Sequence, residues 1–239
     1  MGKPVAVYDA MGGPDTPFTD PGGKHSGGPT HPGKYTLHSA TQHVSSSWPY
    51  SRIVWGAPLK EDPATNDVLY QDRHGKWHSV RARVFDGNKS VNVPDELKDV
   101  NFRYISGRYE LPATWIFNDF GHTTWYMFKD LDGDGKLNPK KGEKIHNEFI
   151  HTTPKNEFQS KEDPKSVVLE HSHGCVHVKP LDIDEMKAKG YLKAGNLFIV
   201  HKGTDKPAVT VAAEDAAKKY KRYELHFFPG LNQIVVYGY

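Results

Sequence analysis

The chain has 239 residues, of which 36% are hydrophobic and 25% are charged, and these fractions are typical of a globular protein. Its formal net charge of +2 is too small to indicate nucleic-acid binding, and no hydrophobic run approaches the roughly 18 residues of a membrane span. The single cysteine excludes an intramolecular disulfide.

Short runs rich in β-branched and aromatic residues recur between glycines and prolines. They predict strands at residues 5–8, 34–37, 52–55, 79–84, 124–128 and 197–200, and a hairpin at residues 223–228 and 233–237. Residues 12–33, rich in Gly, Pro, Thr and Ser, predict a long loop. Many short strands separated by turns favour a sandwich or a barrel.

Two helices are predicted. Asp182 and Glu185 have the spacing of a capping box, with Pro180 before them and Gly190 after them, which predicts a helix over about residues 183–189. The second is predicted near residues 212–220. The chain is therefore predicted to be mostly β, with one or two short helices and a C-terminal hairpin.

The only cysteine, Cys175, lies in the run His-Ser-His-Gly-Cys-Val-His at residues 171–177. Neighbouring imidazoles and glycine amides favour the thiolate, which is the nucleophilic form. Acyl transfer by a thiolate also needs a base and an oxyanion hole. His151, at the end of a predicted strand, and His173 are the candidate bases, and the backbone N–H groups of residues 173–175 are the candidate oxyanion donors.

The segment Ser-His-Gly-Cys at residues 172–175, preceded by Ile-His-Thr-Thr at residues 150–153, resembles the signature of the L,D-transpeptidase catalytic domain, the YkuD family. The segment at residues 28–35 looks like the family's early Pro-Thr-Pro-x-Gly-x-Tyr motif. The resemblance covers about residues 29–201. It implies a mostly β sandwich or cradle at residues 1–202, with residues 203–239 as an extension packed on it.

The resemblance also implies an enzyme that acts on peptidoglycan stem peptides and requires no cofactor. Cys175 would attack the carbonyl of the third, diamino acid residue, expel D-alanine and form a thioester that an amine resolves. His151 would be the base, His173 would stabilise the reacting groups, and Thr152 would orient the base. The oxyanion pocket would be shaped by Ser172 and Gly174. The same thiol would take a carbapenem adduct.

Two features depart from the family pattern. His177 stands where many members carry Arg or Asn, at a position expected to hold the substrate carboxylate. The charged residues 155–170 lengthen the spacing between His151 and Cys175, and they are expected to act as a lid or an acceptor selector. The substrate implies a periplasmic or exported protein, although residues 1–5 contain no hydrophobic signal core. Delivery into a neighbouring cell as a toxin is the alternative.

Other interpretations stay open. Water in place of the amine would make the protein an L,D-carboxypeptidase. The alternating His171, His173, Cys175 and His177 suit zinc, but a straight strand would spread them over roughly 20 Å, so at most two of them could join His151 around one ion. A non-catalytic metal- or wall-binding module would leave the thiol idle and stack glycan on aromatic residues such as tryptophans 48, 55, 115 and 125.

A second metal signal lies at residues 130–138. Its oxygen donors follow the spacing of a calcium-binding loop, and they are Asp130, Asp132, Asp134, Lys136 (through its carbonyl) and Asn138. The twelfth position, where a bidentate acid is expected, is Lys141, and Glu143 follows two residues later. The pattern therefore indicates either a structural calcium loop or an Asp/Gly-rich turn.

Overall fold

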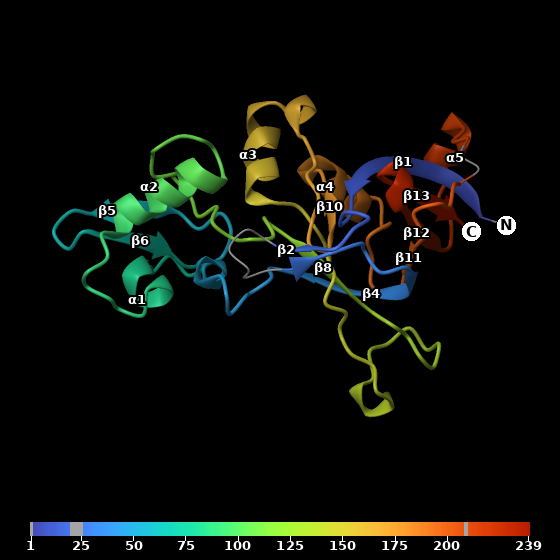
Figure 1. Cartoon of the computed structure of the whole chain (residues 1–239), viewed down its shortest axis with the longest axis horizontal. Coiled ribbons are helices and arrows are strands. Elements are labelled where there is room, and N and C mark those ends of the chain that lie inside the picture. Colours follow the sequence, from blue (N-terminus) through green and yellow to red (C-terminus); the bar gives the residue numbers. More distant parts are fainter. Residues whose placement is uncertain (1, 20–25, 208–209) are drawn as a thin grey trace. The chain divides into compact units, whose positions relative to one another are not determined.

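The structure, a computed structural model, describes residues 2–19, 26–207 and 210–239 (Figure 1). Its contacts divide the chain into two compact units. Unit 1 comprises Met1–Thr41, Trp125–His151 and Val168–Tyr239, and unit 2 comprises Gln42–Thr124 and Thr152–Val167. This division does not coincide with the boundary predicted after residue 202.

Unit 1 is built on a closed barrel. Its eight strands follow the order β1 (Lys3–Met11), β10 (Val176–Val178), β9 (Ile150–His151), β8 (Thr124–Phe128), β4 (Gly33–Thr41), β11 (Leu197–Val200), β12 (Tyr223–Phe228) and β13 (Gln233–Gly238). The pairs β9–β10 and β11–β12 are parallel, whereas β1 is antiparallel to both of its neighbours. The predicted β-sandwich or cradle is therefore wrong, and the sheet is mixed and closed.

The C-terminal hairpin closes the barrel. β12 and β13 pair as predicted, with Leu225 opposite Val236, and β13 then pairs with β1 along most of its length. Figure 1 shows β12 and β13 beside β1. The hairpin is thus part of the barrel wall, because its outer strand meets the first strand of the chain. Alternating hydrophobicity predicted the strands, but it does not report which sheet edges pair.

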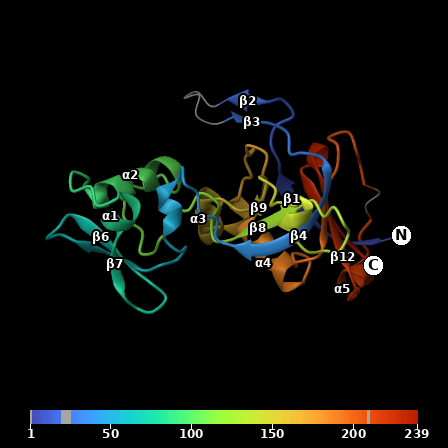
Figure 2. The same cartoon turned by 90° about the horizontal axis from the view of Figure 1, so that it is seen from below.

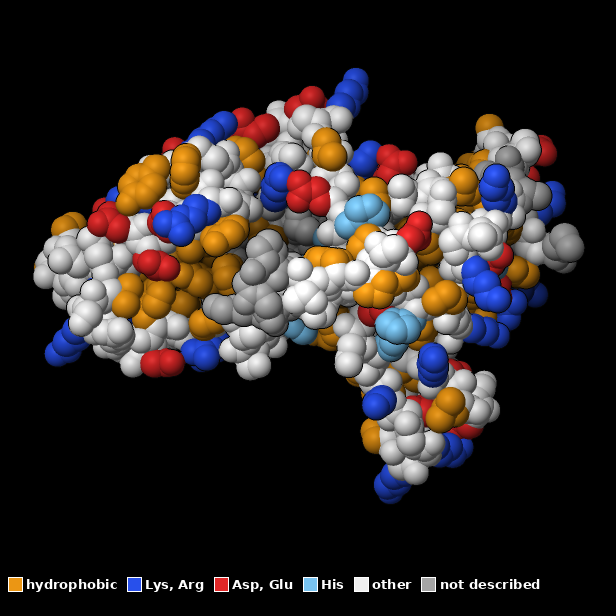
Figure 3. Space-filling model, viewed as in Figure 1, with side chains coloured by type: hydrophobic (Ala, Val, Ile, Leu, Met, Phe, Trp, Pro, Cys, Tyr) orange, Lys and Arg blue, Asp and Glu red, His pale blue; other side chains and the backbone are white. Residues whose placement is uncertain are grey.

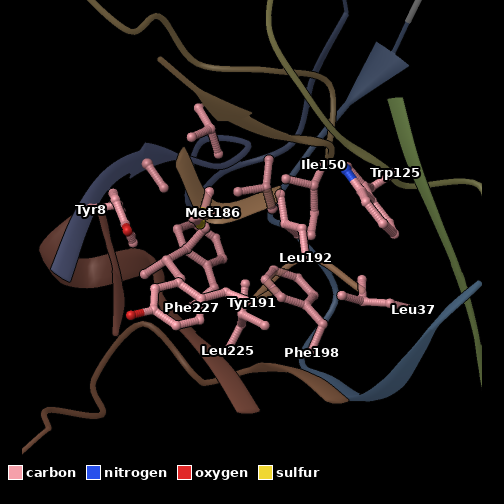
Figure 4. Packing of buried hydrophobic residues seen from close by; sticks show 14 of the residues in the cluster. Tyr8, Leu37, Trp125, Ile150, Met186, Tyr191, Leu192, Phe198, Leu225 and Phe227 are labelled. Carbon is pink, nitrogen blue, oxygen red and sulfur yellow. The ribbon is translucent and has the colours of Figure 1, made fainter. Parts of the chain in front are cut away.

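Hydrophobic side chains fill the barrel (Figure 4). Ile150, Phe198 and Phe227 are fully buried, and each such side chain contributes about 1.5–3 kcal/mol on burial. Helix α4 (Pro180–Ala188) adds Ile183 and Met186 to the same cluster. The predicted helix after Cys175 is therefore present, and it packs on the barrel core.

The remaining elements of unit 1 are short. Helix α4 begins at Pro180 with Lys179 as N-cap and no side-chain cap, so the predicted capping box is wrong and a proline at the first helical position starts the helix. Helix α5 (Ala213–Ala217) falls where the second helix was predicted. Two 3₁₀ turns, η2 (Pro139–Lys141) and η4 (Pro229–Leu231), also belong to unit 1.

The predicted long loop contains a small hairpin made of β2 (Phe18–Thr19) and β3 (Ser26–Gly27). Residues 20–25 of the predicted loop lie outside the described residues. The hairpin matters for the site because it contacts the segment that precedes β10, as described below.

Unit 2 has a core of its own, formed around Trp115, Phe117 and Leu97. A three-stranded sheet of β5 (Leu59–Asp62), β6 (Asp67–Gln71) and β7 (Trp77–Ser79) packs with α1 (Val80–Val84) and α2 (Val93–Tyr104), and Figure 2 shows both helices beside β6 and β7. The predicted lid segment forms α3 (Pro154–Glu162) and η3 (Pro164–Ser166), and η1 is Pro49–Arg52.

Two predicted strands are wrong, and both lie in unit 2. Residues 80–84 form α1, because Ser79, the last residue of β7, caps the helix by accepting a hydrogen bond from the Ala82 N–H at 3.0 Å. Arg52 is the last residue of η1, and residues 53–55 follow it without strand pairing. The described chain contains five α-helices, where one or two were predicted.

The surface carries some hydrophobic side chains. On the face in Figure 3, hydrophobic side chains gather over part of unit 2. Val54, Phe102, Tyr104 and Tyr109 of this unit are all more than half exposed. Among the described residues, every helix is too short or too polar to span a membrane.

Candidate active site around Cys175

Cys175 lies in a bend directly before β10, and it is half-buried and forms no disulfide. β10 pairs in parallel with β9, with Val176 opposite Ile150 and His177 opposite His151. Val176 and Ile150 belong to the barrel core. Because successive side chains of a strand point to opposite faces, His151 and His177 lie on the outer face of the β9–β10 pair. Cys175 comes two residues before His177, in the bend that leads into β10.

Ser172 closes the turn that presents Cys175. Its hydroxyl donates to the Cys175 carbonyl oxygen at 2.5 Å and accepts from the Gly174 N–H at 3.0 Å. Gly174 has φ +133°, a conformation that residues with a Cβ rarely adopt. An oxyanion bound by the Gly174 N–H, as predicted, requires the hydrogen bond to Ser172 to open first.

Two imidazoles, those of His151 and His177, lie edge to face on the outer side of the β9–β10 pair, with ring centroids 4.8 Å apart. His151 is almost completely buried, whereas His177 is half-buried. The residue predicted as the base therefore lies on the strand next to the one that Cys175 precedes. His177 is a second imidazole on the same face that was not considered as a base.

His177 is held in one tautomer. Its Nδ1 lies 2.8 Å from the carbonyl oxygen of Glu170, which only accepts, so Nδ1 carries the proton. Burial lowers the pKa of His177 below its usual value, so the ring is neutral near pH 7 with a lone pair on Nε2. A neutral ring without a hydrogen on Nε2 is poorly suited to the predicted role of holding a carboxylate. It is suited to accepting a proton.

His173 contacts the β2–β3 hairpin. Its exposed ring lies against Phe18 with centroids 5.0 Å apart, and a Cβ on Gly27 would lie 2.7 Å from the His173 Cα. This position, between the turn of the thiol and an exposed hairpin, suits contact with a substrate.

Thr152 directly follows His151 in the chain. It is fully buried, and its hydroxyl donates to the carbonyl oxygen of Thr153 at 3.3 Å. The hydroxyl hydrogen is thus directed at the backbone of the next residue. Its role in orienting the base stays a prediction.

A cluster that was not predicted borders the same turn. Buried Glu148 accepts hydrogen bonds from His31 Nδ1 at 2.5 Å and from the His31 N–H at 3.1 Å, and its Oε2 lies 3.1 Å from His146 Nε2. A Cβ on Gly174 would lie 2.9 Å from Glu148 Oε1, so the carboxylate contacts the turn of the thiol. His31 and Glu148 are 117 residues apart, so no short sequence motif contains both of them.

The aspartates of residues 130–138 converge as a calcium loop requires. Carboxylate oxygens of Asp130, Asp132 and Asp134 lie within 4.8 Å of one another. Asp130 also accepts from the N–H groups of Gly133 and Gly135, as in an Asp/Gly-rich turn. The geometry therefore fits both interpretations.

The other residues of this loop have partners within it. Buried Glu143 accepts from the N–H groups of Leu131 and Asn138, both at 2.7 Å, instead of pointing at the aspartates as a bidentate ligand would. Lys141 forms an ion pair with Asp132 and holds the pKa of that carboxyl below its usual value. The ammonium group of Lys141 would therefore compete with a cation for Asp132. Lys136 donates its N–H to Asp134.

Zinc binding along residues 171–177 and glycan stacking on Trp115 or Trp125 gain little from the geometry. Among the described residues, groups of three or more potential ligands within 4.8 Å occur at His31, His146 and Glu148 and at the three aspartates, not along residues 171–177. Trp115 and Trp125 are buried in hydrophobic cores, so they are not available to stack on glycan.

Comparison of the chain with models of protein families, with curated proteins and with solved structures found no match.

Proposed function

We propose that the protein is a cysteine acyltransferase of the L,D-transpeptidase type that acts on peptidoglycan stem peptides. The observation that carries this proposal is the parallel register of β9 and β10. It brings the buried imidazole of His151 onto the face of the strand that Cys175 precedes, beside the neutral ring of His177. These imidazoles next to the bend that carries the thiol support the proposal, because acyl transfer by a thiol needs a base.

In the proposed reaction an imidazole accepts the proton of the Cys175 thiol, and the thiolate attacks the carbonyl carbon of the third stem residue. The bond to the nitrogen of D-alanine then breaks, and that nitrogen takes the proton from the imidazolium. The resulting thioester is attacked by an amine, which gives its proton to the imidazole as the new amide forms and the thiolate leaves.

A water molecule in place of the amine gives a tripeptide, which is the carboxypeptidase alternative. The proposed substrate places the protein in the periplasm or elsewhere in the cell envelope. His173 and Phe18 would contact the substrate, because both lie at the surface of the turn and the hairpin.

The test uses muropeptides ending in D-alanine, with products identified by mass spectrometry. Cross-linked dimers support transpeptidation, tripeptides alone support carboxypeptidation, and no turnover contradicts both. Cys175→Ala should abolish turnover without loss of the far-UV circular dichroism spectrum, and His74→Ala, at an exposed site in unit 2, is the control. Intact mass after incubation with a carbapenem should show one adduct, absent from Cys175→Ala.

A further inference from the structure

We propose that His31, His146 and Glu148 form a binding site for one divalent transition-metal ion, with zinc as the best match. This site is separate from the thiol chemistry, and it does not depend on Cys175 being reactive. Two imidazoles and one carboxylate are the protein ligands of many catalytic zinc sites, in which the fourth position stays open. Imidazole donors favour zinc, copper or nickel over magnesium or calcium.

The ligand atoms are close to the geometry that an ion requires. One ring nitrogen of His31, one of His146 and one oxygen of Glu148 lie within 4.8 Å of one another. Neighbouring ligand atoms around a tetrahedral zinc ion are roughly 3.3 Å apart, given bonds of about 2.0 Å. His146 Nε2 lies 3.1 Å from Oε2 of Glu148, which nearly fits, whereas His31 Nδ1 lies 2.5 Å from the other oxygen, Oε1, and this distance must widen by roughly 0.8 Å.

The ligands are held by contacts outside the proposed site. Tyr35 stacks on the ring of His146 with centroids 4.7 Å apart, and its hydroxyl donates to the carbonyl oxygen of His31 at 3.0 Å. The N–H of His146 donates to the Met127 carbonyl oxygen at 2.8 Å. Such supporting contacts fix the orientation of metal ligands and raise affinity.

The burial gradient suits an ion that enters from solvent. Glu148 is buried, His146 is half-buried, and the His31 side chain is 74% exposed. The His31 ring can therefore make the shift of roughly 0.8 Å that zinc requires without disturbing the core. A metal ion would take the place of the hydrogen bond between His31 Nδ1 and Glu148. Because Glu148 contacts Gly174, the bound ion would also stabilise the turn of the thiol.

The experiment titrates zinc into Cys175→Ser protein by isothermal calorimetry, so that the thiolate cannot contribute a ligand. One ion per chain is expected. Glu148→Gln, which keeps the shape of the side chain, and His146→Ala should each weaken binding at least 100-fold. His201→Ala is the matched control, since His201 and His226 form another imidazole pair, 2.9 Å apart, elsewhere in unit 1. Zinc should also raise the unfolding midpoint of the parent and leave that of Glu148→Gln unchanged.

Absence of zinc binding by the parent would overturn the proposal. So would equal affinity in Glu148→Gln, or loss of binding in His201→Ala. If His146→Ala fails to fold, Glu148→Gln with a native circular dichroism spectrum decides the question. Visible absorption of the cobalt(II)-loaded Cys175→Ser protein gives a second readout, because tetrahedral coordination by two imidazoles should produce bands that Glu148→Gln lacks.

Discussion

At the scale of single residues, the chemistry depends on which imidazole takes the proton of Cys175. We expect His151→Ala to slow acylation by a carbapenem about 10²- to 10⁴-fold, the usual contribution of a general base. His173→Ala should mainly raise the carbapenem concentration needed for half-maximal rate, because this ring lies at the surface against Phe18. Stopped-flow acylation rates measure both effects.

The same rates test the rival base. His177→Asn keeps a donor for the Glu170 carbonyl but lacks the lone pair that the ring offers on Nε2. If His151→Ala acylates at the parent rate while His177→Asn does not, His177 is the base.

Burial of histidines predicts how folding stability depends on pH. His177, His43 and His226 all have pKa values lowered by burial. Between the lowered pKa of the folded state and the value of about 6.5 in the unfolded chain, the unfolded chain binds more protons than the folded one. The free energy of unfolding is therefore highest above this pH window, and it falls as the pH drops through the window. His177→Asn should reduce this slope by up to about 1.4 kcal/mol per pH unit.

The measurement is the free energy of unfolding in urea at steps between about pH 8 and 5. His74→Asn, at an exposed position, should keep the slope of the parent. An unchanged slope in His177→Asn would show that this ring is not buried in neutral form.

At the scale of elements, the loop of residues 130–138 is either a calcium site or an Asp/Gly-rich turn, and calcium binding distinguishes the two. If calcium binds, it must displace the ammonium of Lys141 from Asp132. We therefore expect Lys141→Ala to bind calcium more tightly than the parent, since the variant lacks the ammonium group that competes for Asp132. Calorimetric titration of the parent, Lys141→Ala and a double Asp132→Ala, Asp134→Ala variant measures this. Equal heats in all three proteins would show that the loop is a turn and not a calcium site.

Elements with strong local signals were predicted well. Residues 124–128 and 197–200 are β8 and β11 with the predicted bounds, because their β-branched and aromatic runs end at clear breaks. Residues 79–84 were predicted as a strand from the same kind of run, but the cap at Ser79 and the packing of Val80 and Val84 in the core of unit 2 select a helix. Tertiary contacts overrode local preference there.

The candidate site likewise has one part that the local sequence predicted and one part that it did not. Cys175, Ser172 and Gly174 were found from a local run of residues, and His151 from its place at a strand end. The tautomer of His177 depends on the carbonyl of Glu170, and the histidines around Glu148 come from distant segments. Neither follows from spacing along the chain, because both are set by strand register and by the closure of the barrel.

At the scale of the whole molecule, closure of the barrel makes residues 203–239 indispensable. The predicted boundary at residue 202 would let residues 1–202 fold alone. In the structure those last residues supply β12 and β13, and the buried side chains of Leu225, Phe227, Ile234 and Val236. Losing one large core side chain costs about 2–5 kcal/mol, and the total stability of a domain is about 5–15 kcal/mol.

We therefore expect a chain that stops at residue 202 to lose the native barrel. Its edges at β1 and β11 would expose unpaired backbone groups and promote aggregation. Size-exclusion chromatography and near-UV circular dichroism measure this, with a full-length Leu231→Ala chain, altered at a partly exposed site in the hairpin turn, as the control. A soluble, cooperatively unfolding 1–202 chain would contradict closure by β13, and it would restore the C-terminal residues to the extension that the sequence predicted.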